Sequence, residues 1–160
     1  MYAYIVLLHV IGAFVFATAH GVSIAVALRL RGARSREQVA ALLELSGLAI
    51  GGLYVGLLLL LVGGIWAGFA GDHWGRLWIW AAIVVLVVIV VLMYAIATPF
   101  YGRMRAASGV LTDPKQVAKF GEIAPDELER MGASSRAIWL TVIGGVGFVV
   151  LLWLMVVKPF

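Results

Sequence analysis

Four long apolar segments, separated by polar stretches, follow one another along the chain. They extend over about residues 2–28, 46–70, 77–98 and 136–157. A helix needs about 20 predominantly apolar residues to cross the hydrocarbon core of a bilayer, so the pattern predicts four membrane-spanning helices. The first segment contains a small-x-small sequence at Ala17–Ala19 that is typical of signal-peptide cleavage sites. It has no positive residues ahead of it and continues to Leu28, so we expect this helix to be retained.

Polar residues and prolines mark the ends of the predicted helices. The connections are predicted at about 29–45 and 99–135, with a tight turn at 71–76. In the first connection, Ser35 followed by Gln38 forms a capping-box pattern, which predicts a helical turn leading into the second span. Pro99 lies at the predicted end of the third span. Asp113-Pro114 and Pro125-Asp126-Glu127 are typical of the starts of short helices in the longest loop.

The composition leaves no room for a separate soluble domain. Of the 160 residues, 64% are hydrophobic and only 12% are charged, and the mean hydropathy is +1.08. A water-soluble domain could not bury this much apolar surface, so the bilayer must solvate most of it. We therefore expect one membrane domain over 1–160, an all-α four-transmembrane-helix bundle built from two antiparallel hairpins.

The distribution of basic residues predicts how the bundle is oriented. Ten of the 12 Lys and Arg residues lie in or beside the two long connections, and the other two are Arg76 and Lys158. The positive-inside rule then places residues 29–45 and 99–135 in the cytoplasm and both termini outside. No basic stripe with interleaved aromatic residues is present, so the sequence gives no indication of nucleic-acid binding.

Glycines are concentrated on the second and fourth spans. Small residues four positions apart let helix backbones approach closely where lipid supplies no hydrophobic driving force. We expect these glycines to pack helices inside the bundle; the alternative is that they dock a membrane partner or a second copy of the chain. The predicted packing positions are Gly47, Gly51, Gly52, Gly56, Gly64, Gly68, Gly144 and Gly145.

Three histidines are the candidate ligand residues. His9 and His20 are 11 residues apart on the first span, which is about three helical turns, so they share one face. His73 lies in the tight turn, where His9, His73 and either Asp72 or Met155 would suit copper or one axial position of a haem. The alternative is that the two helical histidines are neutral, hydrogen-bonded core residues and that His73 is only a loop residue.

The first span also carries a family resemblance. Leu8-His9-Val10-Ile11-Gly12-Ala13-Phe14-Val15-Phe16-Ala17, followed by Arg29-Leu30-Arg31, resembles helix one of a group of small bacterial membrane proteins. The group includes the copper-resistance CopD domain, the HemJ-type protoporphyrinogen oxidases and an uncharacterised family of four-helix integral membrane proteins, which is the most similar in length and loop pattern. The resemblance implies a bacterial cytoplasmic membrane and, at His9, binding of haem b or copper. HemJ-type enzymes also depend on a membrane lysine that this chain lacks, which argues against that oxidase activity.

Three function classes follow from these residues. The favoured one is a non-enzymatic accessory or partner-binding membrane protein, because no base, nucleophile and electrophilic group are gathered in the spans. The alternative is a haem- or copper-binding redox or metal-handling protein that uses His9 with His73 or His20. A proton-coupled transporter ranks last, since the spans contain no carboxylate or lysine beyond their ends. The absence of cysteine excludes disulfides and thiolate ligands.

Overall fold

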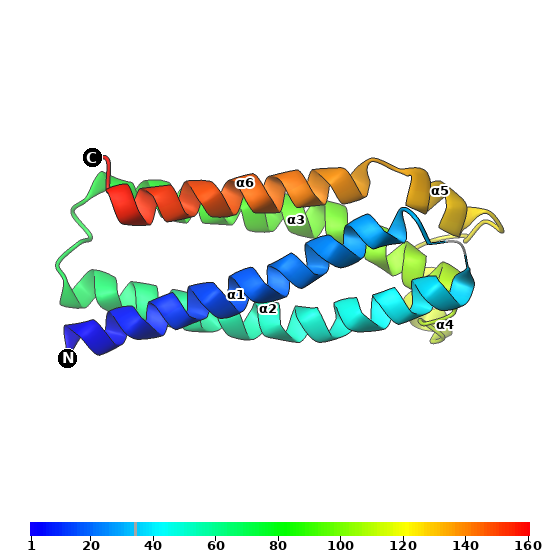
Figure 1. Cartoon of the computed structure of the whole chain (residues 1–160), viewed down its shortest axis with the longest axis horizontal. Helices are drawn as coiled ribbons and strands as arrows, with labels where there is room; N and C mark the ends of the chain where they lie inside the picture. Colours follow the sequence, from blue (N-terminus) through cyan, green and yellow to red (C-terminus); the bar gives the residue numbers. More distant parts are fainter. Residues whose placement is uncertain (34) are drawn as a thin grey trace.

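Six helices make up the regular structure of the part of the chain that is described (Figure 1). The computed structural model describes residues 1–33 and 35–160; Arg34, one of the ten basic residues counted above, lies outside them. The helices are α1 (Tyr2–Leu30), α2 (Arg36–Ala70), α3 (Leu77–Ser108), α4 (Pro114–Ala118), α5 (Glu127–Ala133) and α6 (Arg136–Val157). The four longest are long and apolar enough to cross a membrane. The described chain contains no strand, so the predicted all-α four-helix bundle is confirmed, and the chain is a small multi-pass integral membrane protein.

The long helices pair as two antiparallel hairpins, α1 with α2 and α3 with α6. Both chain ends and the α2–α3 turn lie at one end of the molecule, which we call the terminal end (Figure 1). The opposite end carries α4, α5 and the junctions of α1 with α2 and of α5 with α6, and we call it the loop end. The hairpins contact each other through α1 with α6 and α2 with α3.

The second span is longer than its sequence pattern predicted. α2 begins at Arg36 and not near residue 46, because the Ser35 hydroxyl caps it by accepting a hydrogen bond from the Gln38 backbone N–H at 3.2 Å. Val39 and Leu43 are four residues apart and both are buried, so the first turns of α2 are held by apolar packing. The predicted helical turn before the span is thus continuous with it.

The third span also continues beyond its predicted end. α3 passes through Pro99 to Ser108 and ends at Gly109, whose φ of +80° is the left-handed conformation typical of helix C-termini. A proline inside a helix removes one backbone hydrogen bond. Packing of the next turns compensates for this loss, since Phe100 and Met104 are completely buried. The connection predicted from residue 99 therefore begins at 109.

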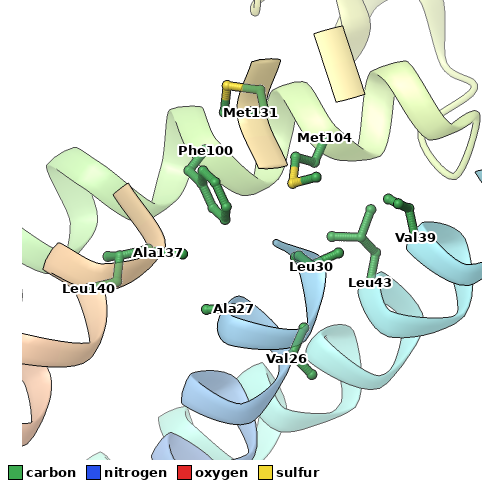
Figure 2. Packing of buried hydrophobic residues seen from close by; sticks show 10 residues of the cluster. All are labelled: Val26, Ala27, Leu30, Val39, Leu43, Phe100, Met104, Met131, Ala137 and Leu140. Atoms are coloured by element: carbon green, nitrogen blue, oxygen red, sulfur yellow. The ribbon is translucent and has the colours of Figure 1, made fainter. Parts of the chain in front are cut away.

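A continuous apolar core lies at the loop end (Figure 2). It joins the last turns of α1, the first turns of α2 and α6, the second half of α3, and α5. Its buried members are Val26, Ala27, Leu30, Val39, Leu43, Phe100, Met104, Met131, Ala137 and Leu140. Both hairpins contribute, so this core is what holds them together.

Candidate functional site

Glycines bring the backbones of α1 and α2 into direct contact. A Cβ built on Gly56 would lie 2.5 Å from the backbone nitrogen of Phe16, and one on Gly63 would lie 2.7 Å from that of His9. A Cβ on Gly12 would overlap the backbone of Leu60 in the same way from the α1 side. Real Cβ atoms do not approach so closely, so only glycine fits at these positions. This contact fixes His9 against α2.

The His9 ring is held in one tautomer by a backbone carbonyl. Its Nδ1 lies 2.7 Å from the carbonyl oxygen of Leu60. A carbonyl only accepts, so Nδ1 carries a proton and donates it, and in the neutral form of the ring Nε2 keeps its lone pair. The half-buried ring also lies against Gly64, where a Cβ would be 2.9 Å from Nδ1. A neutral imidazole whose other nitrogen donates to a carbonyl is the form that binds metals and haem iron.

His20 lies between the two hairpins and is 7% exposed. Its ring stacks on Phe16, with centroids 6.0 Å apart and planes at 11°, and it occupies the space that a side chain at Gly144 of α6 would fill. Within the described chain, the buried Nε2 of His20 and the buried hydroxyl of Ser23 have no hydrogen-bond partner. Nearby, the Tyr101 hydroxyl donates to the Ser23 carbonyl at 3.3 Å.

His73 is at the terminal end, in the α2–α3 turn. Its Nε2 lies 3.0 Å from the hydroxyl of Tyr2, so this pair ties the turn to the start of α1. The ring also contacts Trp78, with centroids 5.9 Å apart. Gly71 leaves the space that the imidazole occupies, since a Cβ there would be 2.5 Å from Nε2.

The three histidines therefore have separate surroundings. His9 bonds to Leu60 and His73 to Tyr2, and within the described residues no hydrogen bond or ring contact joins two of the histidines. Among residues 1–33 and 35–160, no three His, Cys, Asp or Glu side chains could together hold a metal ion. The assignment of copper or haem b to His9, His20 or His73 stays a prediction.

The eight predicted packing glycines divide into two groups. Five of them are packed against another residue, which an added Cβ would meet. These glycines and their neighbours are Gly52 with Ala19, Gly56 with Phe16, Gly64 with His9, Gly68 with Trp74 and Gly144 with His20. The other three, Gly47, Gly51 and Gly145, have nothing within 4 Å of the Cβ position. Gly12, Gly63 and Gly147 make further close contacts that the four-residue spacing did not indicate. The position of Gly12 on the face shared by His9 and His20 was the available signal for it.

Arginines organise the loop end, a role that the orientation argument did not reveal. Arg103 donates to the Glu127 carboxylate and to the backbone carbonyls of Phe120 at 2.7 Å and Glu122 at 3.2 Å. The hydrogen bond from Arg103 holds the pKa of the buried Glu127 carboxyl below its usual range, against the opposing effect of burial. Arg36 donates twice to the Ala107 carbonyl near the end of α3, at 3.1 and 2.6 Å. These contacts connect α2, α3 and α5.

Comparisons of the chain with protein-family models, with curated proteins and with solved structures found no match.

Proposed function

We propose that the chain is a non-enzymatic accessory protein that binds a membrane partner through the outward face of α2. The outward glycine pair is the observation that carries this proposal. Gly47 and Gly51 have no neighbouring atom within 4 Å of the Cβ position, so their backbone is open to another helix. Small residues four apart are the spacing at which two membrane helices pack backbone to backbone.

The rest of this face is apolar and exposed. Tyr54 and Leu58 continue the helical spacing of Gly47 and Gly51, and their side chains are 69% and 63% exposed. Gly52, Gly56 and Gly63 lie on the opposite side of α2, against α1. α2 thus has one glycine face in use within the hairpin and a second one that a partner helix, from another protein or from a second copy, can cover.

The chemistry of the spans supports the same proposal. Residues 2–28, 46–70 and 77–98 contain no Asp, Glu, Lys or Arg, and the fourth span has only Arg136 at its start. General acid–base catalysis or a proton relay in the membrane uses such groups, usually held together. His9 and His20 are on the same helix with different neighbours, which suits a structural role better than shared catalysis.

A pair of leucine substitutions tests the partner face. We expect Gly47→Leu with Gly51→Leu to fold normally and to reduce the size of the complex extracted from native membranes in mild detergent. Gly145→Leu is the matched control, because Gly145 on α6 is equally free of neighbours but has Thr141 and Val149 four residues away. Co-purification of two differently tagged copies separates self-association from binding of another protein. An unchanged complex in the double variant would contradict the proposal.

Haem or copper binding at His9 is the second candidate. It is favoured by the Nε2 lone pair that the bond to the Leu60 carbonyl leaves free. The visible spectrum and metal content of the purified protein test it, with His20→Ala as the comparison for His9→Ala. If His9→Ala removes a Soret band or bound copper and His20→Ala does not, haem or copper binding would be favoured over the accessory function.

We further propose a bacterial cytoplasmic membrane as the location, with the loop end in the cytoplasm. The ten-to-two distribution of Lys and Arg supports this orientation, and the first-span resemblance to small bacterial membrane proteins supports the organism class. Reporter fusions at residue 110 and at the C-terminus test it. A cytoplasmic signal from the C-terminal fusion would reverse the orientation.

A further inference from the structure

A cavity of about 230 Å³ lies at the terminal end, and neither His9, His20 nor the outward face of α2 lines it. One water occupies about 30 Å³ of liquid, so the space is large enough for a small polar group. It is bounded by the α2–α3 turn, the start of α3 and the residues that follow α6. The lining residues are His73, Arg76, Trp78, Lys158 and Phe160.

Two positively charged side chains, Arg76 and Lys158, line the cavity, and no acidic side chain does. Within the described residues, neither Arg76 nor Lys158 forms an ion pair, and neither side chain forms a hydrogen bond. Asp72, the acidic residue of the turn, is not among the lining residues. The Lys158 ammonium lies 5.4 Å from the centroid of the Trp78 ring, a cation–π contact that holds it at the cavity wall. The arrangement therefore favours an anion.

The walls and the position indicate what kind of anion fits. Trp78 and Phe160 give the cavity apolar walls, which a freely hydrated ion does not need. The cavity also lies where α3 begins and α6 ends, the level at which lipid headgroups surround a spanning helix. Leu77 at the start of α3 and Val156 near the end of α6 are exposed apolar side chains that acyl chains can cover.

We propose that this cavity binds the phosphate of an anionic phospholipid. Arg76 pairs with phosphate oxygens through its planar guanidinium, and Lys158 supplies a second positive charge. Trp78 and Phe160 contact the glycerol region, and the acyl chains lie along α3 and α6. The proposal is independent of the partner face and of any ligand at His9.

Lipid titration of the full-length protein in detergent, followed by native mass spectrometry, tests this site. We expect phosphatidylglycerol to bind more tightly than phosphatidylcholine. The double variant Arg76→Gln with Lys158→Gln should bind phosphatidylglycerol at least about tenfold more weakly, because charged hydrogen bonds to phosphate are lost. Lys115→Gln with Lys119→Gln is the control with equal charge change, since both lysines are exposed at the loop end.

A variant that keeps both charges tests the site separately from folding. Arg76→Lys with Lys158→Arg retains both charges and should retain the preference for phosphatidylglycerol, even if the glutamine variant fails to fold. Equal weakening in the Lys115 and Lys119 control would show non-specific charge attraction and overturn the site. Binding of inorganic phosphate in place of the lipid, or no preference between the two lipids, would also overturn it.

Discussion

The loop end and the terminal half of this bundle are held together by different kinds of packing. At the loop end, bulky apolar side chains from both hairpins are buried against one another, with Phe100 and Met104 at the centre. In the terminal half, α1 and α2 are in direct backbone contact, where Gly12, Gly56 and Gly63 bring the two helices together. Large apolar side chains there are mostly exposed, as Phe14 is at 71%.

The solvent explains this difference. Moving apolar side chains out of water into the protein interior stabilises the folded state. Moving them out of lipid stabilises it little, because acyl chains are as apolar as the protein. Helix pairing in the lipid-facing part therefore depends on close backbone contact, and pairing near the aqueous loops depends on an ordinary apolar core. Substitutions in the two regions should differ in the same way.

The largest expected effect is at the loop end. Phe100→Ala removes a completely buried ring, so we expect it to lower the free energy of unfolding by about 3–5 kcal/mol. Phe14→Ala is the matched control in the terminal half, and because its ring already contacts lipid we expect a change within about 0.5 kcal/mol. Unfolding in mixed micelles measures both. Equal losses would mean that the two regions do not differ as described.

Adding a methyl group at a glycine tests the backbone contact in the terminal half. Gly63→Ala places a Cβ 2.7 Å from the backbone nitrogen of His9, so the two helices must separate, at a cost of about 1–3 kcal/mol. Gly51→Ala on the outward face of α2 meets nothing, and the better helix propensity of alanine should leave stability unchanged or slightly higher. The same unfolding assay applies. A neutral Gly63→Ala would show that close backbone contact does not hold this hairpin.

The ion pair between Arg103 and Glu127 at the loop end should make the stability of the protein sensitive to acid. The hydrogen bond from Arg103 holds the folded pKa of Glu127 below its unfolded value of about 4.5. The contribution of the ion pair to the free energy of unfolding is therefore complete above about pH 4.5. It is lost as the pH falls through the lower folded pKa. Glu127→Gln should cost about 1.5 kcal/mol at neutral pH, the lower end for a charged hydrogen bond, since Arg103 is partly exposed.

The measurement is the free energy of unfolding as a function of pH. Between neutrality and acid pH the wild type should lose stability relative to Glu127→Gln, so that the two curves converge. Glu129→Gln serves as the control, because this neighbouring carboxylate is exposed and forms no ion pair within the described chain. Parallel curves for wild type and Glu127→Gln would show that the ion pair does not stabilise the loop end.

The sequence predicted the four spans well because lipid imposes a length and an apolar composition on every spanning helix. It ended the third span too early, because Pro99 is a local signal and the burial of Phe100 that outweighs it is a tertiary one. Glycine spacing pointed to α2 as a packing helix. It could not distinguish the glycines that meet α1 from Gly47 and Gly51, since that depends on which face α1 covers.

The candidate ligands show the same limit. Sequence placed His9 and His20 on one helix face by their spacing, which any regular helix preserves. It did not reveal that the Leu60 carbonyl fixes the His9 tautomer, because this contact joins residues 51 positions apart. It also did not reveal the cavity that Arg76 and Lys158 share, since the two residues meet only when the start of α3 pairs with the end of α6.

The smallest expected effect concerns His9 itself. If backbone contact holds α1 to α2, the side-chain bond from His9 Nδ1 to Leu60 is an addition to that contact, and His9→Ala should cost only about 1 kcal/mol. His9→Asn keeps an N–H donor near the Leu60 carbonyl and should recover part of that loss. Both are compared with Gly63→Ala in one unfolding series. A loss from His9→Ala larger than that from Gly63→Ala would make the polar bond, and not the glycine contact, the main link of the hairpin in the terminal half.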